Sequence, residues 1–118
     1  MTKVQESKDC GNSPKNRFVQ DVAIALETGL LQPEMIASNV ACHGIADSPI
    51  EGLQQLERYL ADRATPAAIV INHAISHGKV GAASGETTLA NGHKRRFSHI
   101  LEFTNTKANC VASIDSYS

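Results

Sequence analysis

Four polar side chains in the second half of the chain, His73, Ser84, Glu86 and His99, are of the types that carry acid–base chemistry. A histidine beside a carboxylate on an apolar wall can serve as a general acid or base, because its pKa is easily shifted around neutrality. The candidate catalytic residues are therefore His99, His73 and Glu86, with His99 working together with either of the other two. Two alternatives stay open: the group contacts a ligand without chemistry, or its members only satisfy one another's hydrogen bonds.

Two tight turns would bring these side chains to one face of a sheet. The pair Asn91-Gly92 is typical of a two-residue hairpin turn, and it predicts that Ser84 lies opposite His99. A similar turn at Gly78-Lys79 would place His73 opposite Ser84, and residues directly opposite in an antiparallel pair share a face. The face with the polar group is expected to comprise Ile69, Ile71, His73, Ile75, Val80, Ala82, Ser84, Glu86, Phe97, His99, Leu101 and Phe103. The other face would carry the mostly small residues Ala74, Gly81, Ala83, Gly85, Ser98 and Ile100.

The apolar surroundings of the polar group predict a pocket for a small, largely apolar ligand. The side chains expected to contact that ligand are Ser84, Ile71, Phe97, Leu101, Ile114 and Ser116. No metal is expected, because His73 and His77 would lie about 13 Å apart along a strand, too far to bind one ion. Nothing in the sequence resembles a phosphate-binding glycine loop or a nucleophile elbow, and we expect no cofactor.

The elements that must position these residues are an antiparallel sheet and the helices before it. Residues 69–117 predict four consecutive antiparallel strands. Ser13-Pro14 predicts the start of a helix whose apolar stripe runs through Phe18, Val22 and Leu26, with Gly29 as its end. Its stripe should pack against the apolar face of the sheet.

Shorter elements are expected between this helix and the sheet. Pro33 could open a short helix, and residues 39–43 read as a short strand. Residues 48–51 have the form of a capping box that would begin another helix. Helices followed by an antiparallel sheet predict an α+β fold.

Length and composition favour one ordinary globular domain. The 118 residues predict a flexible N-terminal segment at 1–11 and a single domain at 12–118. A net charge of -1 argues against nucleic acid as a partner, even with the basic run at residues 93–96. No apolar run approaches a membrane span and no secretory signal is apparent. The three scattered cysteines favour a reducing compartment, so a cytoplasmic location is expected.

Five local stretches of the chain together carry a family resemblance: residues 10–15, 50–52, 77–81 and 97–103 and the closing Ile114-Asp115-Ser116-Tyr117. They resemble the nuclear transport factor 2-like superfamily, in particular small bacterial SnoaL-like proteins. The resemblance covers about residues 10 to 118. It implies a cone in which a curved antiparallel sheet wraps around about three helices and encloses a pocket. It also implies a homodimer through the sheet.

The superfamily includes ketosteroid isomerases, and their catalytic positions can be carried over one by one. The general-base aspartate falls near Gly44, the oxyanion-hole tyrosine near Val22 and the second oxyanion donor on His99. Since two of these three residues lack the required chemistry, ketosteroid isomerase activity is not expected.

Three functions stay open. The first is a domain that binds a small ligand in the cone pocket, and the second is a small isomerase, cyclase or hydrolase that uses His99. The third is a non-catalytic dimerisation module. In each case we expect a homodimer that pairs through the small-residue face of the sheet.

Overall fold

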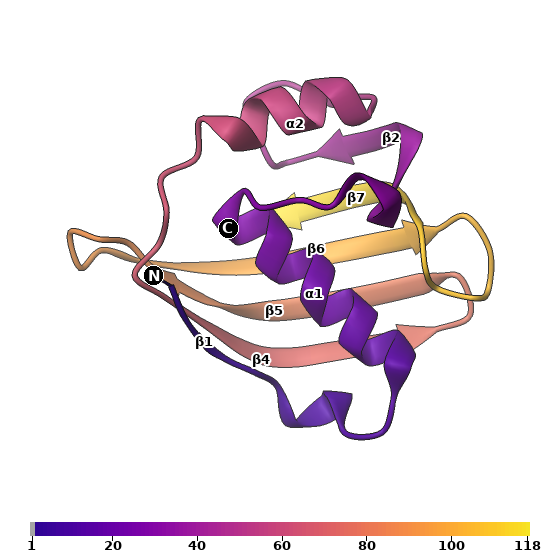
Figure 1. Cartoon of the computed structure of the whole chain (residues 1–118), viewed down its shortest axis with the longest axis horizontal. Helices are drawn as coiled ribbons and strands as arrows, with labels where there is room; N and C mark the ends of the chain where they lie inside the picture. The colour runs from indigo at the N-terminus through magenta and orange to yellow at the C-terminus, as the bar shows by residue number, and fades with distance from the viewer. Residues whose placement is uncertain (1) are drawn as a thin grey trace.

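A 15-residue helix, α1 (Pro14–Thr28), lies across one face of a seven-stranded sheet (Figure 1). The structure, a computed structural model, describes residues 2–118. The Ser13 hydroxyl caps the helix by accepting from the Asn16 backbone N–H, and Pro14 occupies the first helical position. Gly29 ends the helix with a left-handed φ of 81°. The predicted start and end of this helix are therefore confirmed.

The sheet has the strand order β1-β4-β5-β6-β7-β2-β3. The strands are β1 (Lys3–Gln5), β2 (Ile36–His43), β3 (Ile50–Glu51), β4 (Ala68–His77), β5 (Val80–Thr88), β6 (Lys94–Phe103) and β7 (Val111–Tyr117). The antiparallel meander β4 to β7 confirms the four strands predicted for residues 69–117. However, β1 pairs with β4 and β2 with β7 in parallel, so the sheet is mixed and the prediction of an antiparallel sheet was wrong at its edges.

Residues 2–118 contain two α-helices rather than the expected three. The second is α2 (Leu53–Ala61), and the stretch around Pro33 forms only a short 3-10 helix, η2 (Pro33–Met35). Residues 48–51 do not begin a helix, because Ile50–Glu51 pairs with β2 as strand β3 and α2 starts after Gly52. The side chain of Gln55 accepts from the backbone N–H of Glu51, the residue before the Gly52 N-cap.

The N-terminal segment contributes to the sheet and to the core. Strand β1 pairs with residues 68–70 of β4, and a 3-10 helix, η1 (Lys8–Cys10), follows it and buries the Cys10 side chain. The polar sequence of this segment does not predict a strand, because it has no period-2 alternation of apolar residues. The flexibility expected of residues 1–11 stays a prediction.

Two deviations of one residue each decide which side chains share a face. The turn at Gly78-Lys79 has two residues as predicted, and His73 lies opposite Ser84. Beyond that pair a β-bulge at Asn72 shifts the register, so that Ile71 lies opposite Gly85 and not opposite Glu86.

The second deviation is the turn between β5 and β6. The Leu89 backbone N–H donates to the His93 carbonyl across the three residues 90–92, and Gly92 has a φ of 87°. This loop, a form common in hairpins, is one residue longer than the predicted turn. His99 therefore lies opposite Ala83 rather than Ser84, and Leu101 opposite Gly81 rather than Ala82. A slip of one residue moves every side chain of one strand to the other face relative to its neighbour.

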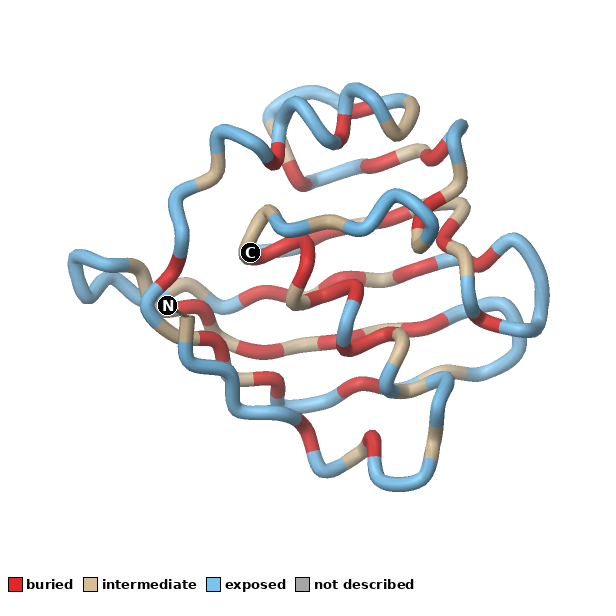
Figure 2. Tube along the Cα trace, in the orientation of Figure 1, coloured by how far each residue is buried: buried red, intermediate tan, exposed pale blue. Residues whose placement is uncertain are grey.

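The predicted faces are consequently mixed. We call the face that packs on α1 the inner face; it consists of Ile69, Ile71, Ala74, Gly81, Ala83, Gly85, Thr87, Arg95, Phe97, His99, Leu101, Phe103, Val111, Ile114 and Ser116. The outer face carries Val70, His73, Ile75, Val80, Ala82, Ser84, Glu86, Arg96, Ser98, Ile100, Glu102 and Tyr117. Buried and less buried residues alternate along these strands (Figure 2).

The core lies between α1 and the inner face, as predicted. Val22 and Leu26 of the helix and Leu101 of the sheet are fully buried. Gly81 allows the helix to approach closely, because a Cβ at this position would lie 2.6 Å from the Val19 side chain. This packing sets the distance at which α1 presents its polar side chains to the sheet.

Candidate functional site

A buried carboxylate, Glu27, faces the sheet from the last turn of α1. Gln20 and Ala23, which lie about two turns and one turn earlier in α1, are also buried, so Glu27 continues the buried face of the helix. The Glu27 side chain is 1% exposed, and its carboxylate accepts hydrogen bonds from three side chains of the inner face. A buried charge is costly unless it is paired and hydrogen-bonded, and here it is both.

Each of the three partners comes from β5 or β6, two interior strands of the sheet. Thr87 of β5 donates to Oε1 of Glu27 at 2.8 Å, and the Arg95 guanidinium donates to the same oxygen. Nε2 of His99 lies 2.8 Å from Oε2 and donates to it. On the other side of the His99 ring, Nδ1 lies 2.7 Å from Oγ of Ser116 on β7. We refer to Glu27, Thr87, Arg95, His99 and Ser116 as the Glu27 cluster.

The cluster keeps Glu27 ionised. Burial is the largest single influence on its pKa and raises it. The hydrogen bond and charge of His99, the hydroxyl of Thr87 and the charge of Arg95 together outweigh burial and lower the pKa from 4.5 to about 2. An ionised Glu27 fixes the proton of His99 on Nε2 and leaves Nδ1 to accept the Ser116 hydroxyl proton when the ring is neutral.

Members of this cluster line two adjoining hollows, and a third hollow shares Gly44, Ile45 and Ser118 with the smaller of them. A small cavity of about 40 Å³ is lined by Glu27, Arg95, Phe97, His99 and Ser116, together with Gly44, Ile45, Arg63, Tyr117 and Ser118. It shares Glu27, Arg63 and Arg95 with a hollow of about 420 Å³ that Tyr59, Asp62, Ala64 and Leu89 complete. The small cavity can hold a water molecule or one functional group, whereas the larger hollow has the size of a small-molecule site.

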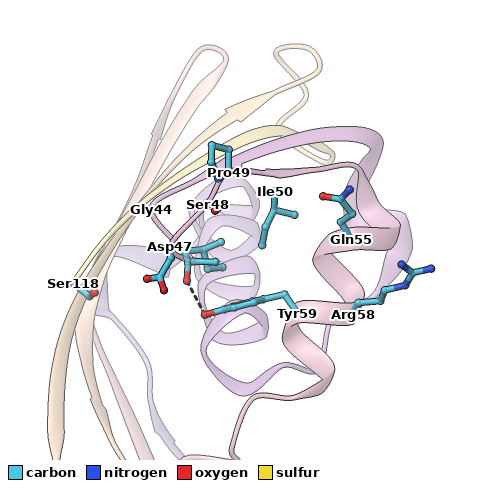
Figure 3. Close-up of a pocket in the computed structure, with 11 residues that line it drawn as sticks. Gly44, Asp47, Ser48, Pro49, Ile50, Gln55, Arg58, Tyr59 and Ser118 are labelled. Carbon is cyan, nitrogen blue, oxygen red and sulfur yellow. Dashed lines mark hydrogen bonds between the residues drawn. The ribbon is translucent and has the colours of Figure 1, made fainter.

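The third hollow, of about 710 Å³, lies between α2 and the loop of residues 44–49 (Figure 3). The Tyr59 hydroxyl donates to the backbone carbonyl of Ile45 at 2.8 Å and so ties this loop to α2. Gly44 sits directly against β7, since a Cβ there would lie 2.0 Å from the Ser116 carbonyl oxygen. Any larger residue at this position would push the loop away from Ser116.

The structure separates the predicted catalytic residues. His99 is 2% exposed on the inner face, but His73 and Glu86 lie on the outer face. His73 contacts Asp9 at 3.1 Å, and Glu86 pairs with Lys94 at 3.9 Å. The prediction that His99 and Glu86 line one cavity was therefore wrong, because the three-residue loop places their side chains on opposite faces.

The predicted ligand contacts divide in the same way. Phe97 and Ser116 line the small cavity beside His99, and the Phe97 and His99 rings stack at 5.2 Å. Ile71, Leu101 and Ile114 are buried in the core and line none of the hollows described above. Ser84 lies on the outer face.

Sequence reasoning missed Glu27, Thr87 and Arg95. A charged residue near the end of a helix is typically solvated, and Arg95 belongs to a basic run that reads as an exposed strand. One signal was available for Glu27. It follows Gln20 by seven residues and Ala23 by four, which places all three on one helix face.

Two further features bear on the class of site. Residues 2–118 contain no cluster of three or more His, Cys, Asp or Glu side chains arranged to hold a metal ion. Neither α-helix in this range has the length and apolar character needed to cross a bilayer.

The fold is that of NTF2-like proteins. A structure from Burkholderia xenovorans LB400, an NTF-2 like protein of unknown function, matches with a TM-score of 0.69 and 18% identity over 87% of this chain and 81% of that chain. A "putative ketosteroid isomerase" from Kribbella flavida DSM 17836 matches with a TM-score of 0.69 and 13% identity, over 86% and 75%. A "putative polyketide cyclase" from Sinorhizobium meliloti matches with a TM-score of 0.65 and 9% identity, over 86% and 94%.

No family model and no curated protein matches the sequence. Together the structural matches show that the chain has the NTF2-like α+β fold, as its sequence motifs indicated. At these identities the likeness concerns the fold alone, and a fold of this kind hosts unrelated functions. The function must therefore be argued from the Glu27 cluster and the hollows beside it.

Proposed function

We propose that the chain binds a small molecule at the end of the sheet where the three hollows meet, with the polar part of the ligand against the Glu27 cluster. The observation that carries this proposal is the concentration of buried polarity at one point. Of the six buried polar or charged residues among residues 2–118, four belong to this cluster: Glu27, Thr87, His99 and Ser116. Because buried charge seldom improves stability over an apolar core, such a concentration beside a hollow favours a binding role.

The donors around the hollow indicate the chemistry of the ligand. Arg63 donates to the Leu26 carbonyl and lies over the Tyr59 ring, and within residues 2–118 it has no carboxylate partner within 4.0 Å. The buried Nε of Arg95 has no hydrogen-bond partner. These free donors favour a ligand with a carbonyl or carboxylate group, whose apolar body would occupy the larger hollow beside Leu89.

A blocked variant tests this proposal. Ala64 is exposed and lines the hollow of about 420 Å³, so Ala64→Trp should fill that hollow without disturbing the core. Ala61, exposed at the end of α2 and outside the three hollows, offers Ala61→Trp as the matched control.

The assay is a thermal-shift screen of aliphatic and aromatic carboxylic acids, each beside its methyl ester and amide. Members of the panel should raise Tm for the unmodified protein and for Ala61→Trp, but not for Ala64→Trp. A panel that shifts none of the three proteins, or all of them alike, would contradict the proposal.

A second candidate function is acid–base catalysis at the same place. It is favoured by the chain of contacts from Ser116 through His99 to Glu27, which supplies a histidine with a fixed tautomer. In this function Glu27 is the catalytic partner of His99, a role that the sequence analysis gave to His73 or Glu86. Two proteins of similar fold carry the names of a cyclase and an isomerase. Ketosteroid isomerase chemistry is not proposed, because Val22 is an apolar core residue and Gly44 has no side chain.

A further inference from the structure

We propose that Ser116 is a nucleophile, activated by His99 and Glu27, that hydrolyses small carboxylic esters. This inference deepens the second candidate function and rests on the proposed ligand site. It names the residue that forms a covalent bond and the class of substrate. Neither the spacing of Ser116 in the sequence nor its local motif points to this role.

The geometry is that of a serine–histidine–carboxylate relay. Oγ of Ser116 lies 2.7 Å from Nδ1 of His99, and Nε2 of His99 lies 2.8 Å from Oε2 of Glu27. Both distances are within the range in which a base can take a serine proton while a carboxylate holds the ring. Such relays are recognised by the roles of their members and not by their order in the chain.

The relay is held rigidly by its surroundings. Thr87 and Arg95 fix the Glu27 carboxylate through its other oxygen, and Phe97 stacks on the His99 ring. Glu27, His99 and Ser116 come from α1, β6 and β7, three elements of the core and not mobile loops. A relay on rigid elements loses little to reorganisation when the reaction begins.

Ser116 also faces a space that can receive a reacting group. Its side chain lines the cavity of about 40 Å³ together with Arg63 and Arg95. The volume admits a carbonyl group, while the body of the ester would extend into the hollow of about 420 Å³ that shares both arginines. The guanidinium groups can stabilise the negative oxygen that forms when Oγ attacks the carbonyl.

The reaction balances with water as the only co-reactant. Oγ of Ser116 forms a bond with the carbonyl carbon while its proton moves to Nδ1 of His99, and Glu27 stabilises the resulting imidazolium through Nε2. The tetrahedral intermediate collapses, the bond to the leaving alkoxide breaks, and the proton passes from His99 to the departing alcohol. Water then attacks the acyl-serine by the same route, which releases the carboxylic acid and restores Ser116.

Labelling with diisopropyl fluorophosphate tests the nucleophile directly, because the reagent forms an O–P bond with an activated serine and releases fluoride. The unmodified protein should gain one adduct by intact mass, and peptide mapping should locate that adduct on Ser116. This mapping needs no variant, so it does not depend on whether a substituted protein folds. An unlabelled protein, or an adduct elsewhere, would overturn the proposal.

Matched variants separate the relay from a structural network. Ser116→Ala should abolish labelling, whereas Ser113→Ala should not, because Ser113 lies on the same strand but lines none of the three hollows. His99→Gln should slow labelling by about 100-fold or more. The rate for the unmodified protein should rise with pH through one titration, and Glu27→Gln should move that midpoint. Far-UV circular dichroism confirms that each variant is folded.

The outcome distinguishes this inference from the binding proposal. A ligand shift that Ala64→Trp removes, without labelling of Ser116, leaves binding supported and overturns the nucleophile. Labelling and hydrolysis of p-nitrophenyl acetate without any ligand shift in the panel would support the nucleophile and contradict the broader ligand proposal. If labelling and ester hydrolysis proceed at the same rates in the unmodified protein and in Ser116→Ala, the cluster is only a buried polar network.

Discussion

The most consequential single residue is Glu27, because its charge is held almost entirely inside the protein. Its side chain is 1% exposed, and each of its two oxygens accepts at least one hydrogen bond. Removing one partner of such a buried pair leaves the other without compensation, which typically costs more than the pair contributes over an apolar replacement. The cluster should therefore respond to substitution and to acid as a unit.

Acid should weaken the fold through Glu27. Its pKa falls from 4.5 to about 2 on folding, which corresponds to roughly 3 kcal/mol of stability. A lowered pKa contributes stability above the unfolded value, and that contribution is lost as pH falls from about 4.5 toward about 2. Urea unfolding of the unmodified protein and Glu27→Gln should show a large difference in stability at about pH 6 that shrinks at about pH 2.5.

An exposed glutamate provides the control for this experiment. Glu57 lies on the exposed side of α2, so Glu57→Gln should change the free energy of unfolding by less than about 0.5 kcal/mol at either pH. If the difference between the unmodified protein and Glu27→Gln does not depend on pH, the carboxylate is not held ionised as described.

At the scale of elements, the turn between β5 and β6 decides which face carries His99. Its three residues include Gly92 at a φ of 87°, a conformation that costs other residues about 1–2 kcal/mol. A side chain at Gly92 would meet nothing within 4 Å, so a substitution there reports backbone strain alone. This makes the turn a clean place to test the register.

Gly92→Ala should lower the free energy of unfolding by about 1–2 kcal/mol, measured by urea denaturation. Gly92→Asn is the matched control and should lose less, because asparagine tolerates the left-handed region better than alanine does. Equal losses in the two variants, or no loss in either, would contradict the left-handed turn that places His99 on the inner face.

The same elements show how far the sequence could predict the fold and the site. The caps of α1 and the meander β4 to β7 followed from local signals, Ser13-Pro14, Gly29 and alternating apolar residues. The assignment of side chains to the two faces did not follow from the sequence. The bulge at Asn72 and the extra loop residue each shift a strand by one residue, which moves its side chains to the opposite face. His99 was identified as a candidate, but Glu27 was not, since its burial depends on partners that lie 60, 68 and 72 residues later in the chain.

At the scale of the molecule, α1 packs on the inner face, whereas the side chains of the outer face are intermediate or exposed rather than buried. Three large apolar side chains on the outer face are exposed: Ile75 (55%), Val80 (48%) and Tyr117 (61%). A shallow hollow of about 120 Å³ lies between Ile75, His77, Val80 and Ala82. Exposed apolar side chains gathered on one sheet face are typical of an interaction surface.

We propose that a second copy of the chain covers this outer face as a symmetric homodimer. The face differs from the one that the sequence predicted, because Ala74, Gly81, Ala83 and Gly85 lie on the inner face, while Ser98 and Ile100 do lie outside. A variant at Ala83 would thus disrupt the core, and the suitable probe is Ala82→Arg. Arg96 and Glu102 share the outer face and could pair across a two-fold axis.

Sedimentation velocity at micromolar concentration should find a dimer for the unmodified protein and a monomer of unchanged circular dichroism for Ala82→Arg. The expected loss has a simple cause: the variant would place two arginines in the apolar interface, where burying their charge costs several kcal/mol. Ala61→Arg, on the exposed end of α2, introduces the same charge away from the sheet and should remain dimeric. An unmodified protein that sediments as a monomer would refute the homodimer, and a dimer that survives Ala82→Arg would place its interface elsewhere. Ser116 and its cavity lie on the inner side of the sheet, so splitting the dimer should leave the labelling rate of Ser116 unchanged.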